Sequence, residues 1–232
     1  EPKFVPADGV VIELKDAVSL KVRMVDCVGY IVDGALGHEE NGKQRLVSTP
    51  WSKDAMTFEE AAEIGTKKVI RDHSTIGVVV ITDGSVTGIE RGNYIEAEER
   101  VIDELKSIQK PFVVVLNSMT PKEEKTELLR KELEEKYEVP ILPVNVEEMN
   151  ESDIENILET VLYDFPVNEI RINISKWVEG LEKNHWIKQS IIATLKECIA
   201  SLQKIRDIDD IINGFKELEF LEGVNVDSVE LG

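Results

Sequence analysis

The fold is decided by the stretch Val22-Arg23-Met24-Val25-Asp26-Cys27-Val28-Gly29. An apolar strand runs into an acid, and a glycine follows three residues later, which is the D-x-x-G pattern of nucleotide-hydrolysing α/β proteins. Ligands of open α/β sheets bind at the carboxyl ends of the strands, where Asp26 could hold Mg²⁺ directly or through water. Gly29 would let the backbone approach a γ-phosphate. Taken alone, the pattern fits equally well an acid that caps a tight turn.

The composition indicates a globular protein, because 42% of the 232 residues are hydrophobic and 31% are charged. The only two cysteines, Cys27 and Cys198, lie far apart. This favours a reducing cytosol and argues against a disulfide framework or a cysteine zinc site. The three histidines are scattered, so we expect no zinc.

The charge of the chain bears on its partners. It has 27 basic and 46 acidic residues, which gives a net charge of −19. Such a surface repels nucleic acid and anionic lipid unless basic residues segregate into a patch, and here they alternate with acids. We therefore predict no nucleic-acid partner.

Strand and helix patterns alternate through the first two thirds of the chain. β-branched runs at residues 75–81, 111–116 and 139–146 predict buried parallel strands, the last at a sheet edge because of Pro140 and Pro143. Residues 10–15 and 19–26 predict an antiparallel hairpin before them. Helices are expected from capping boxes at Thr57, Thr120 and Ser152, and over residues 93–109. The fold class is thus α/β, a mostly parallel doubly wound sheet with an antiparallel hairpin.

Two further segments complete the organisation. The long polar loop at residues 29–50 is either a conformational switch that follows the phosphate sensor or a disordered insertion. The rhythm changes at Pro166, which predicts a nucleotide-binding domain over residues 1–166 and the start of a smaller α+β domain over residues 167–232. In the second domain, residues 167–175 and 224–231 alternate like strands, and residues 177–214 are helical.

The order of hairpin, D-x-x-G and buried strands resembles the second half of a translation-factor-type GTPase. The base-recognition pattern N-K-x-D would follow the strand at residues 111–116, where the chain reads Asn117-Ser118-Met119-Thr120. Asn117 is kept as a candidate scaffold of the base loop. Thr120 replaces the aspartate that accepts hydrogen bonds from guanine, which argues against GTP.

Several short stretches of the sequence also resemble one family, the stage IV sporulation protein A family of spore-forming Firmicutes. The matching stretches include Arg71-Asp72-His73-Ser74-Thr75-Ile76-Gly77, Gly34-Ala35-Leu36-Gly37-His38, Thr82-Asp83-Gly84-Ser85 and Leu116-Asn117-Ser118, together with the stretches around Glu1 and Asp26.

This resemblance implies an ATPase derived from GTPases, with ATP and Mg²⁺ as cofactors. Asp26 would be the catalytic, metal-binding Walker B aspartate, and Gly29 and Asn117 would bind the nucleotide. Family members polymerise after ATP hydrolysis into the basement layer of the spore coat. The implied partners are the chain itself, other coat proteins and a small amphipathic membrane-bound peptide, in the mother-cell cytoplasm at the forespore surface.

Two departures from the family pattern set further expectations. The chain contains no G-x-x-x-x-G-K-[ST] motif, and the family's sensing threonines would precede Glu1. In this fold the first strand lies between the strand that ends at Asp26 and the strand at residues 75–81. We therefore expect rearranged pairing, a complementing chain or a longer protein, and weak or no ATP binding by this piece alone.

Two alternatives remain at this point: a non-catalytic interaction module that keeps the nucleotide fold as an assembly surface, and an ordinary regulatory GTPase. Asp83 is expected to cap a loop. Tyr30 stands where many GTPases have a water-orienting glutamine, and it cannot do that task in the same way.

Overall fold

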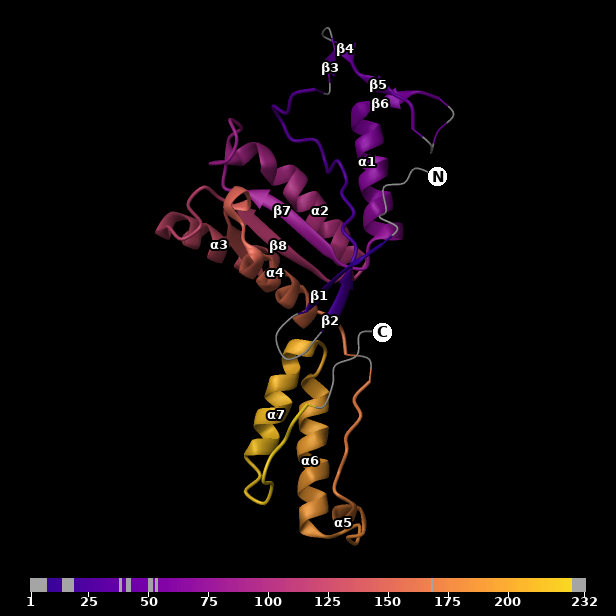
Figure 1. Ribbon diagram of the computed structural model, residues 1–232, viewed down its shortest axis with the longest axis vertical. Helices are drawn as coiled ribbons and strands as arrows, with labels where there is room; N and C mark the ends of the chain where they lie inside the picture. The colour runs from indigo at the N-terminus through magenta and orange to yellow at the C-terminus, as the bar shows by residue number, and fades with distance from the viewer. Residues whose placement is uncertain are drawn as a thin grey trace. The chain divides into compact units, whose positions relative to one another are not determined.

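The structure is a computed structural model (Figure 1), and it describes residues 8–13, 19–37, 39–40, 43–49, 52, 54–167 and 169–226. The chain divides into two compact units, Glu1–Val161 and Leu162–Gly232, and each is described by itself.

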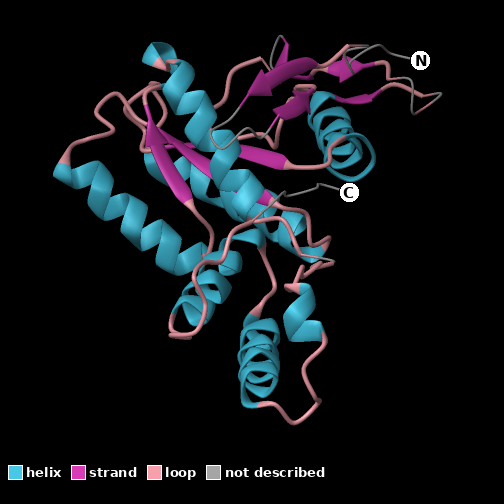
Figure 2. Ribbon diagram, turned by 60° about the horizontal axis from the view of Figure 1, so that its bottom comes forward, coloured by secondary structure: helices cyan, strands magenta, loops and turns pink. Residues whose placement is uncertain are grey.

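The first unit is built around a three-stranded parallel sheet (Figure 2), with strand order β7-β8-β9. These strands are β7 (Gly77–Thr82), β8 (Phe112–Asn117) and β9 (Ile141–Val144). In register, Val79 lies opposite Val114, which lies opposite Ile141. The predicted α/β class and the edge position of β9 are therefore confirmed.

Helices connect the strands and pack against the sheet, and both faces of β8 are buried. The 3₁₀ turn η3 (Arg91–Tyr94) and α2 (Ile95–Ser107) lead from β7 to β8, α3 (Glu124–Tyr137) leads from β8 to β9, and η4 (Val146–Glu148) and α4 (Glu151–Tyr163) follow. One buried cluster joins α2, α3 and the sheet, and it includes Val79, Ile81, Ile102, Leu105, Val114, Leu116, Leu133, Tyr137 and Ile141.

The predicted helix starts have mixed outcomes. Thr57 forms a full capping box with Glu60 and opens α1 (Phe58–Lys68), which continues into the π-helix η2 (Val69–His73). Thr120 is not a cap, because α3 begins only at Glu124 and its N-cap position is Glu123. The Thr120 N–H donates to Ser118 Oγ at 3.1 Å. Ser152 is not a cap either. Its own N–H donates to Asn150 Oδ1 at 2.9 Å, so Asn150 caps α4.

The predicted hairpin is present as β1 (Val10–Glu13) and β2 (Ser19–Val22), paired antiparallel. The second strand is shorter than predicted: its register ends with Val22 opposite Val10, and residues 23–26 belong to no strand. Lys15 lies outside the described residues.

The long stretch after Gly29 carries short antiparallel pairs where it is described. These pair β3 (Glu39–Glu40) with β4 (Lys43–Gln44), and β5 (Leu46–Val47) with β6 (Met56–Thr57). It is therefore not a single unstructured loop over its described part.

The sheet is open at β7. No described strand pairs with the side of β7 that faces away from β8. Val78 and Val80 are 46% and 60% exposed, whereas their register partners Val113 and Val115 are buried. The residues before Asp26 and β7 are thus not paired with each other.

The second unit is helical where it is described. It contains α5 (Lys176–Glu179), α6 (Trp186–Ser201), the 3₁₀ turn η5 (Ile205–Asp207) and α7 (Ile208–Lys216), packed around Val178, Ile191 and Phe215.

The predicted strand at residues 167–175 is wrong: its described residues belong to no strand, and Ile174 packs against the helical cluster instead. Residues 224–226 form no strand, and residues 227–231 lie outside the described part. Among the described helices, none combines the length and the apolar character needed to cross a membrane.

Candidate functional site

The turn from Asp26 to Gly29 lines a cavity of about 450 Å³ on the open side of β7. Asp26 is exposed, and no described residue forms an ion pair with it. The described residues contain no cluster of three His, Cys, Asp or Glu side chains that could hold a metal by itself. A lone carboxylate still fits Mg²⁺, which takes one or two protein carboxylates and completes its shell with phosphate and water. The role of Asp26 as metal ligand therefore stays a prediction.

The backbone of Gly29 is positioned by a buried hydroxyl. Gly29 has φ +82°, a left-handed conformation that favours glycine. Its N–H donates to Thr66 Oγ1 at 3.1 Å, and Thr66 on α1 is only 2% exposed. The N–H that the sequence offers to a phosphate is thus engaged by α1.

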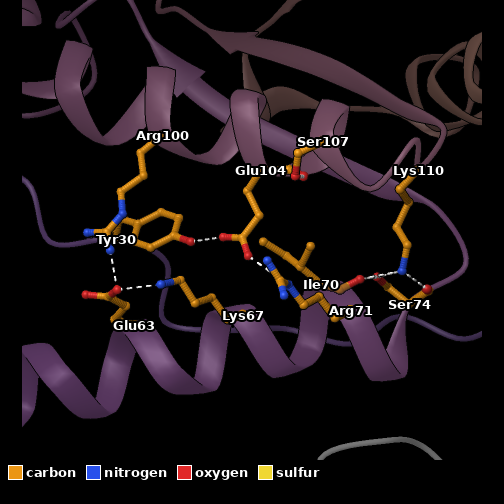
Figure 3. A network of polar contacts seen from close by, with 10 residues as sticks. All are labelled: Tyr30, Glu63, Lys67, Ile70, Arg71, Ser74, Arg100, Glu104, Ser107 and Lys110. Atoms are coloured by element: carbon orange, nitrogen blue, oxygen red, sulfur yellow. Dashed lines mark hydrogen bonds and ion pairs between the residues drawn. The ribbon is translucent and has the colours of Figure 1, made fainter.

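Tyr30 extends the same turn toward α2 (Figure 3). Its hydroxyl donates to the Glu104 carboxylate, and the Arg100 guanidinium lies 4.4 Å from the centre of its ring. Arg100 also pairs with Glu63 of α1, and Arg71 Nε donates to Glu104 at 3.1 Å. Burial, together with the hydrogen bond to Glu104, raises the pKa of Tyr30 well above its ordinary value. The turn is therefore held between α1 and α2.

A second cavity, of about 350 Å³, lies at the carboxyl ends of β8 and β9. Its lining residues are Val86, Thr87, Asn117, Met119, Asn145, Val146 and Glu147. Asn117 Oδ1 accepts a 3.1 Å hydrogen bond from the N–H of Val146, so its side chain braces one loop against the next. Nucleotide binding by Asn117 remains a prediction. The cavities show that Asp26 and Gly29 lie together, and that Asn117 lies in a different cavity.

Ser118 stands at the position of the missing lysine and has a different task. It is fully buried, and its hydroxyl donates to Asp83 Oδ2 at 2.6 Å. Asp83 Oδ1 accepts from the N–H of Ser85 at 2.9 Å. Asp83 therefore ties together the loops that follow β7 and β8, and it caps its own loop as expected.

Sequence reasoning missed Thr66 and Glu104. Thr66 follows Ala62 by four residues on the buried side of α1, and a polar residue on an apolar stripe was the available signal. Glu104 gave no such signal, because its partners lie far away in the sequence.

The chemistry of the first cavity limits what it can do alone. Apart from Asp26 and Glu98, the described residues that line it carry no charge at neutral pH, and most are apolar. Without a lysine or arginine among them, they offer no cation to neutralise a triphosphate. The lining of the cavity therefore suits an apolar group better than phosphates.

Comparison with known proteins identifies the family. Residues 1–166 match the profile of the "Stage IV sporulation protein A, ATPase domain", and residues 167–232 match that of the "Stage IV sporulation protein A, middle domain". The chain belongs to the stage IV sporulation protein A family. Over all 232 residues it is 74% identical to stage IV sporulation protein A of Clostridioides difficile (strain 630), 47% identical to that of Bacillus subtilis (strain 168) and 43% identical to that of Bacillus anthracis.

The chain spans about half the length of these relatives, since the match covers 47% of each. No solved structure matches the chain. Both cavities, with Asp26, Gly29 and Asn117, fall within the region that matches the ATPase domain of the stage IV sporulation protein A family. The candidate residues Asp26, Gly29 and Asn117 therefore lie in the region that matches a domain described as an ATPase domain.

Proposed function

We propose that this chain is part of an ATPase that acts in sporulation, and that hydrolysis by the full-length protein drives its self-assembly into a scaffold of the spore coat basement layer. The observation that carries the proposal is the position of Asp26: it is exposed, unpaired with any described residue, and lines a cavity beside an open sheet edge. In this proposal Asp26 holds Mg²⁺, directly or through water, and the metal neutralises charge on the transferred phosphoryl group.

The second cavity supports binding of an adenine base. Asn117 braces its wall, and Met119 is 50% exposed and offers an apolar surface to a base. Thr120 carries no carboxylate that could accept from guanine, and the carboxylate of Asp83 is already bound by Ser118 and Ser85. This arrangement favours ATP over GTP.

The phosphates of ATP need cationic groups that the described lining of the first cavity does not supply. We propose that residues outside this chain supply a phosphate loop and a further strand, which adds to the open edge of β7. The alternating N–H and C=O groups of that edge need partners, and exposed Val78 and Val80 would be covered. The chain alone should therefore bind ATP weakly or not at all.

The assembly partners of the proposal rest on family membership. They are further copies of the same protein, other coat proteins and a small amphipathic membrane-bound peptide that anchors the coat at the forespore surface, contacted through regions outside this chain.

The test uses a protein extended to the full length of its relatives, with Asp26→Asn and the control Asp103→Asn, an exposed acid of α2 that does not line the cavity. Phosphate release from ATP and from GTP is measured together with sedimentation of assemblies. We expect Asp26→Asn to lower ATP turnover by at least about 10-fold and to reduce assembly, and the control to match the wild type.

Other results would select the alternatives. Absence of hydrolysis by the wild type, with assembly unchanged in Asp26→Asn, would support a non-catalytic assembly module. A preference for GTP would support a regulatory GTPase.

A further inference from the structure

Two acceptors compete for the backbone N–H of Gly29. It donates to Thr66 Oγ1 at 3.1 Å in the structure, and the proposed function assigns it to the γ-phosphate of ATP. A backbone N–H carries a single hydrogen, so a full hydrogen bond to one acceptor excludes a full bond to the other. The contact with Thr66 and the contact with phosphate are therefore competing states of one turn.

Helix α1, which carries Thr66, is fixed against α2. Glu63 pairs with Arg100, and Arg71 donates to Glu104. Lys110, three residues beyond α2, donates to the carbonyls of Ile70 and Ser74 at the end of η2 (Figure 3). With the helix pinned at these points, the Asp26–Tyr30 turn is the part that can move.

The turn itself has few attachments. Of its described hydrogen bonds, one joins Gly29 to Thr66 and one joins the Tyr30 hydroxyl to Glu104. Met24 and Val28, on either side of Asp26, are 83% and 65% exposed, so these two side chains add little apolar packing. The described polar attachments of the turn are thus two hydrogen bonds and the contact of the Arg100 guanidinium with the Tyr30 ring.

We propose that Thr66 is a latch: its hydroxyl holds the Asp26–Tyr30 turn against α1 in the absence of ATP, and the γ-phosphate takes the N–H of Gly29 from it. The inference rests on the proposed function, because it needs Gly29 to face the nucleotide. It makes Thr66 a positioning residue that distinguishes ATP from ADP, since ADP has no γ-phosphate to compete for the N–H.

The first test compares Thr66→Val, which removes the hydroxyl at nearly constant shape, with Thr66→Ser, which retains it, in the full-length protein. Dissociation constants are measured for a non-hydrolysable ATP analogue and for ADP. We expect Thr66→Val to bind the ATP analogue roughly 3- to 10-fold more tightly, because binding no longer breaks the Thr66 bond, with ADP affinity unchanged. Thr66→Ser should resemble the wild type. Equal shifts for both nucleotides, or no gain for the ATP analogue, would overturn the latch.

The second test needs no nucleotide. Cys27 lies within the turn and serves as a probe in a Cys198→Ser background, where the rate of thiol labelling reports how often the turn opens. We expect labelling several-fold faster in Thr66→Val than in Thr66→Ser, and equal rates would contradict the proposal. Should the valine variant be unstable, Thr66→Ala takes its place.

These tests separate the two ideas. A wild-type protein that binds no ATP refutes the proposed function and, with it, the competition between Thr66 and the γ-phosphate; the labelling result then decides only whether Thr66 holds the turn. A wild type that binds ATP, with no selective gain in Thr66→Val, refutes the latch alone.

Discussion

The hydroxyl of Ser118 donates a 2.6 Å hydrogen bond to the carboxylate of Asp83, across 35 residues of sequence. The second oxygen of Asp83 accepts from Ser85, whose hydroxyl in turn accepts from the N–H of Met119. One carboxylate therefore sets the relative position of two loops, one of which carries the residue next to Asn117. The wall of the second cavity depends on this buried contact.

We expect Ser118→Ala to lower the free energy of unfolding by about 1–3 kcal/mol, because Asp83 loses a buried donor to a charged group. The measurement is urea unfolding of the 232-residue chain. Ser107→Ala is the control: the Ser107 hydroxyl bonds to a carbonyl of its own helix on an exposed surface, and its loss should cost less than about 0.5 kcal/mol. Equal costs for the two variants would show that the Asp83 contact contributes no special stability.

The same carboxylate predicts a pH dependence. Burial alone would raise the pKa of Asp83, but the hydrogen bonds from Ser118 and Ser85 outweigh it and hold the pKa below its ordinary value. A lowered folded pKa gives stability that is fully present above the unfolded pKa of about 3.9 and is lost as pH falls through the folded value.

The difference in unfolding free energy between wild type and Ser118→Ala should therefore stay constant from about pH 7 to pH 5, and shrink below about pH 4. Urea unfolding at each pH measures it. A difference that is independent of pH down to the acid transition would argue against ionised Asp83 as the acceptor.

Tyr137→Phe should destabilise the first unit by about 1–3 kcal/mol, because the Tyr137 hydroxyl donates at 2.7 Å to Glu98, which is 3% exposed. Arg91 supplies the other contact of that carboxylate, through Nη2. Tyr163→Phe, at a 49% exposed position, is the matched control and should have little effect.

The same pair of variants gives a spectroscopic check. Burial and the bond to Glu98 raise the pKa of Tyr137 to about 12. Tyr30, which also ionises late, is first replaced by Phe. In an absorbance titration, the tyrosine that ionises last in this Tyr30→Phe protein should then be missing when Tyr137→Phe is added.

Val80→Asp tests the open sheet edge. Val80 is already 60% exposed in this chain, so the change should cost the isolated chain about 1 kcal/mol or less. If a strand from outside covers Val80 in the full-length protein, the buried carboxylate should cost about 3 kcal/mol or more there.

The matched substitution is Leu128→Asp, on an exposed position of α3, which should behave alike in both proteins. Thermal unfolding of the four variants measures the comparison. Equal effects of Val80→Asp in the two proteins would show that nothing covers the edge.

Much of the fold could be predicted because its signals are local. The β-branched runs became β7, β8 and β9, and Thr57 with Glu60 formed the capping box that their spacing indicates. The errors came where other contacts overrode a local pattern. Thr120 has the sequence of a cap, but its carbonyl accepts from the N–H of Glu123 in a turn, and α3 begins only at Glu124.

In the candidate site, too, the local pattern could be predicted and the long-range contacts could not. The D-x-x-G pattern pointed to Asp26 and Gly29, and both line one cavity. The contacts that hold them join Gly29 to Thr66 across 37 residues and Tyr30 to Glu104 across 74 residues. No short-range pattern encodes such pairs, because they depend on how α1 and α2 come together.

The uncovered side of β7 also affects how aggregation of the purified 232-residue chain should be interpreted. The edge of β7 that pairs with no described strand, together with the exposed Val78 and Val80, is a template on which identical molecules can stack edge to edge. Clumping of this 232-residue piece in a test tube would then be a by-product of its exposed ladder. Under the proposed function, only filaments that vanish when ATP turnover is blocked in the full-length protein would count as the proposed assembly.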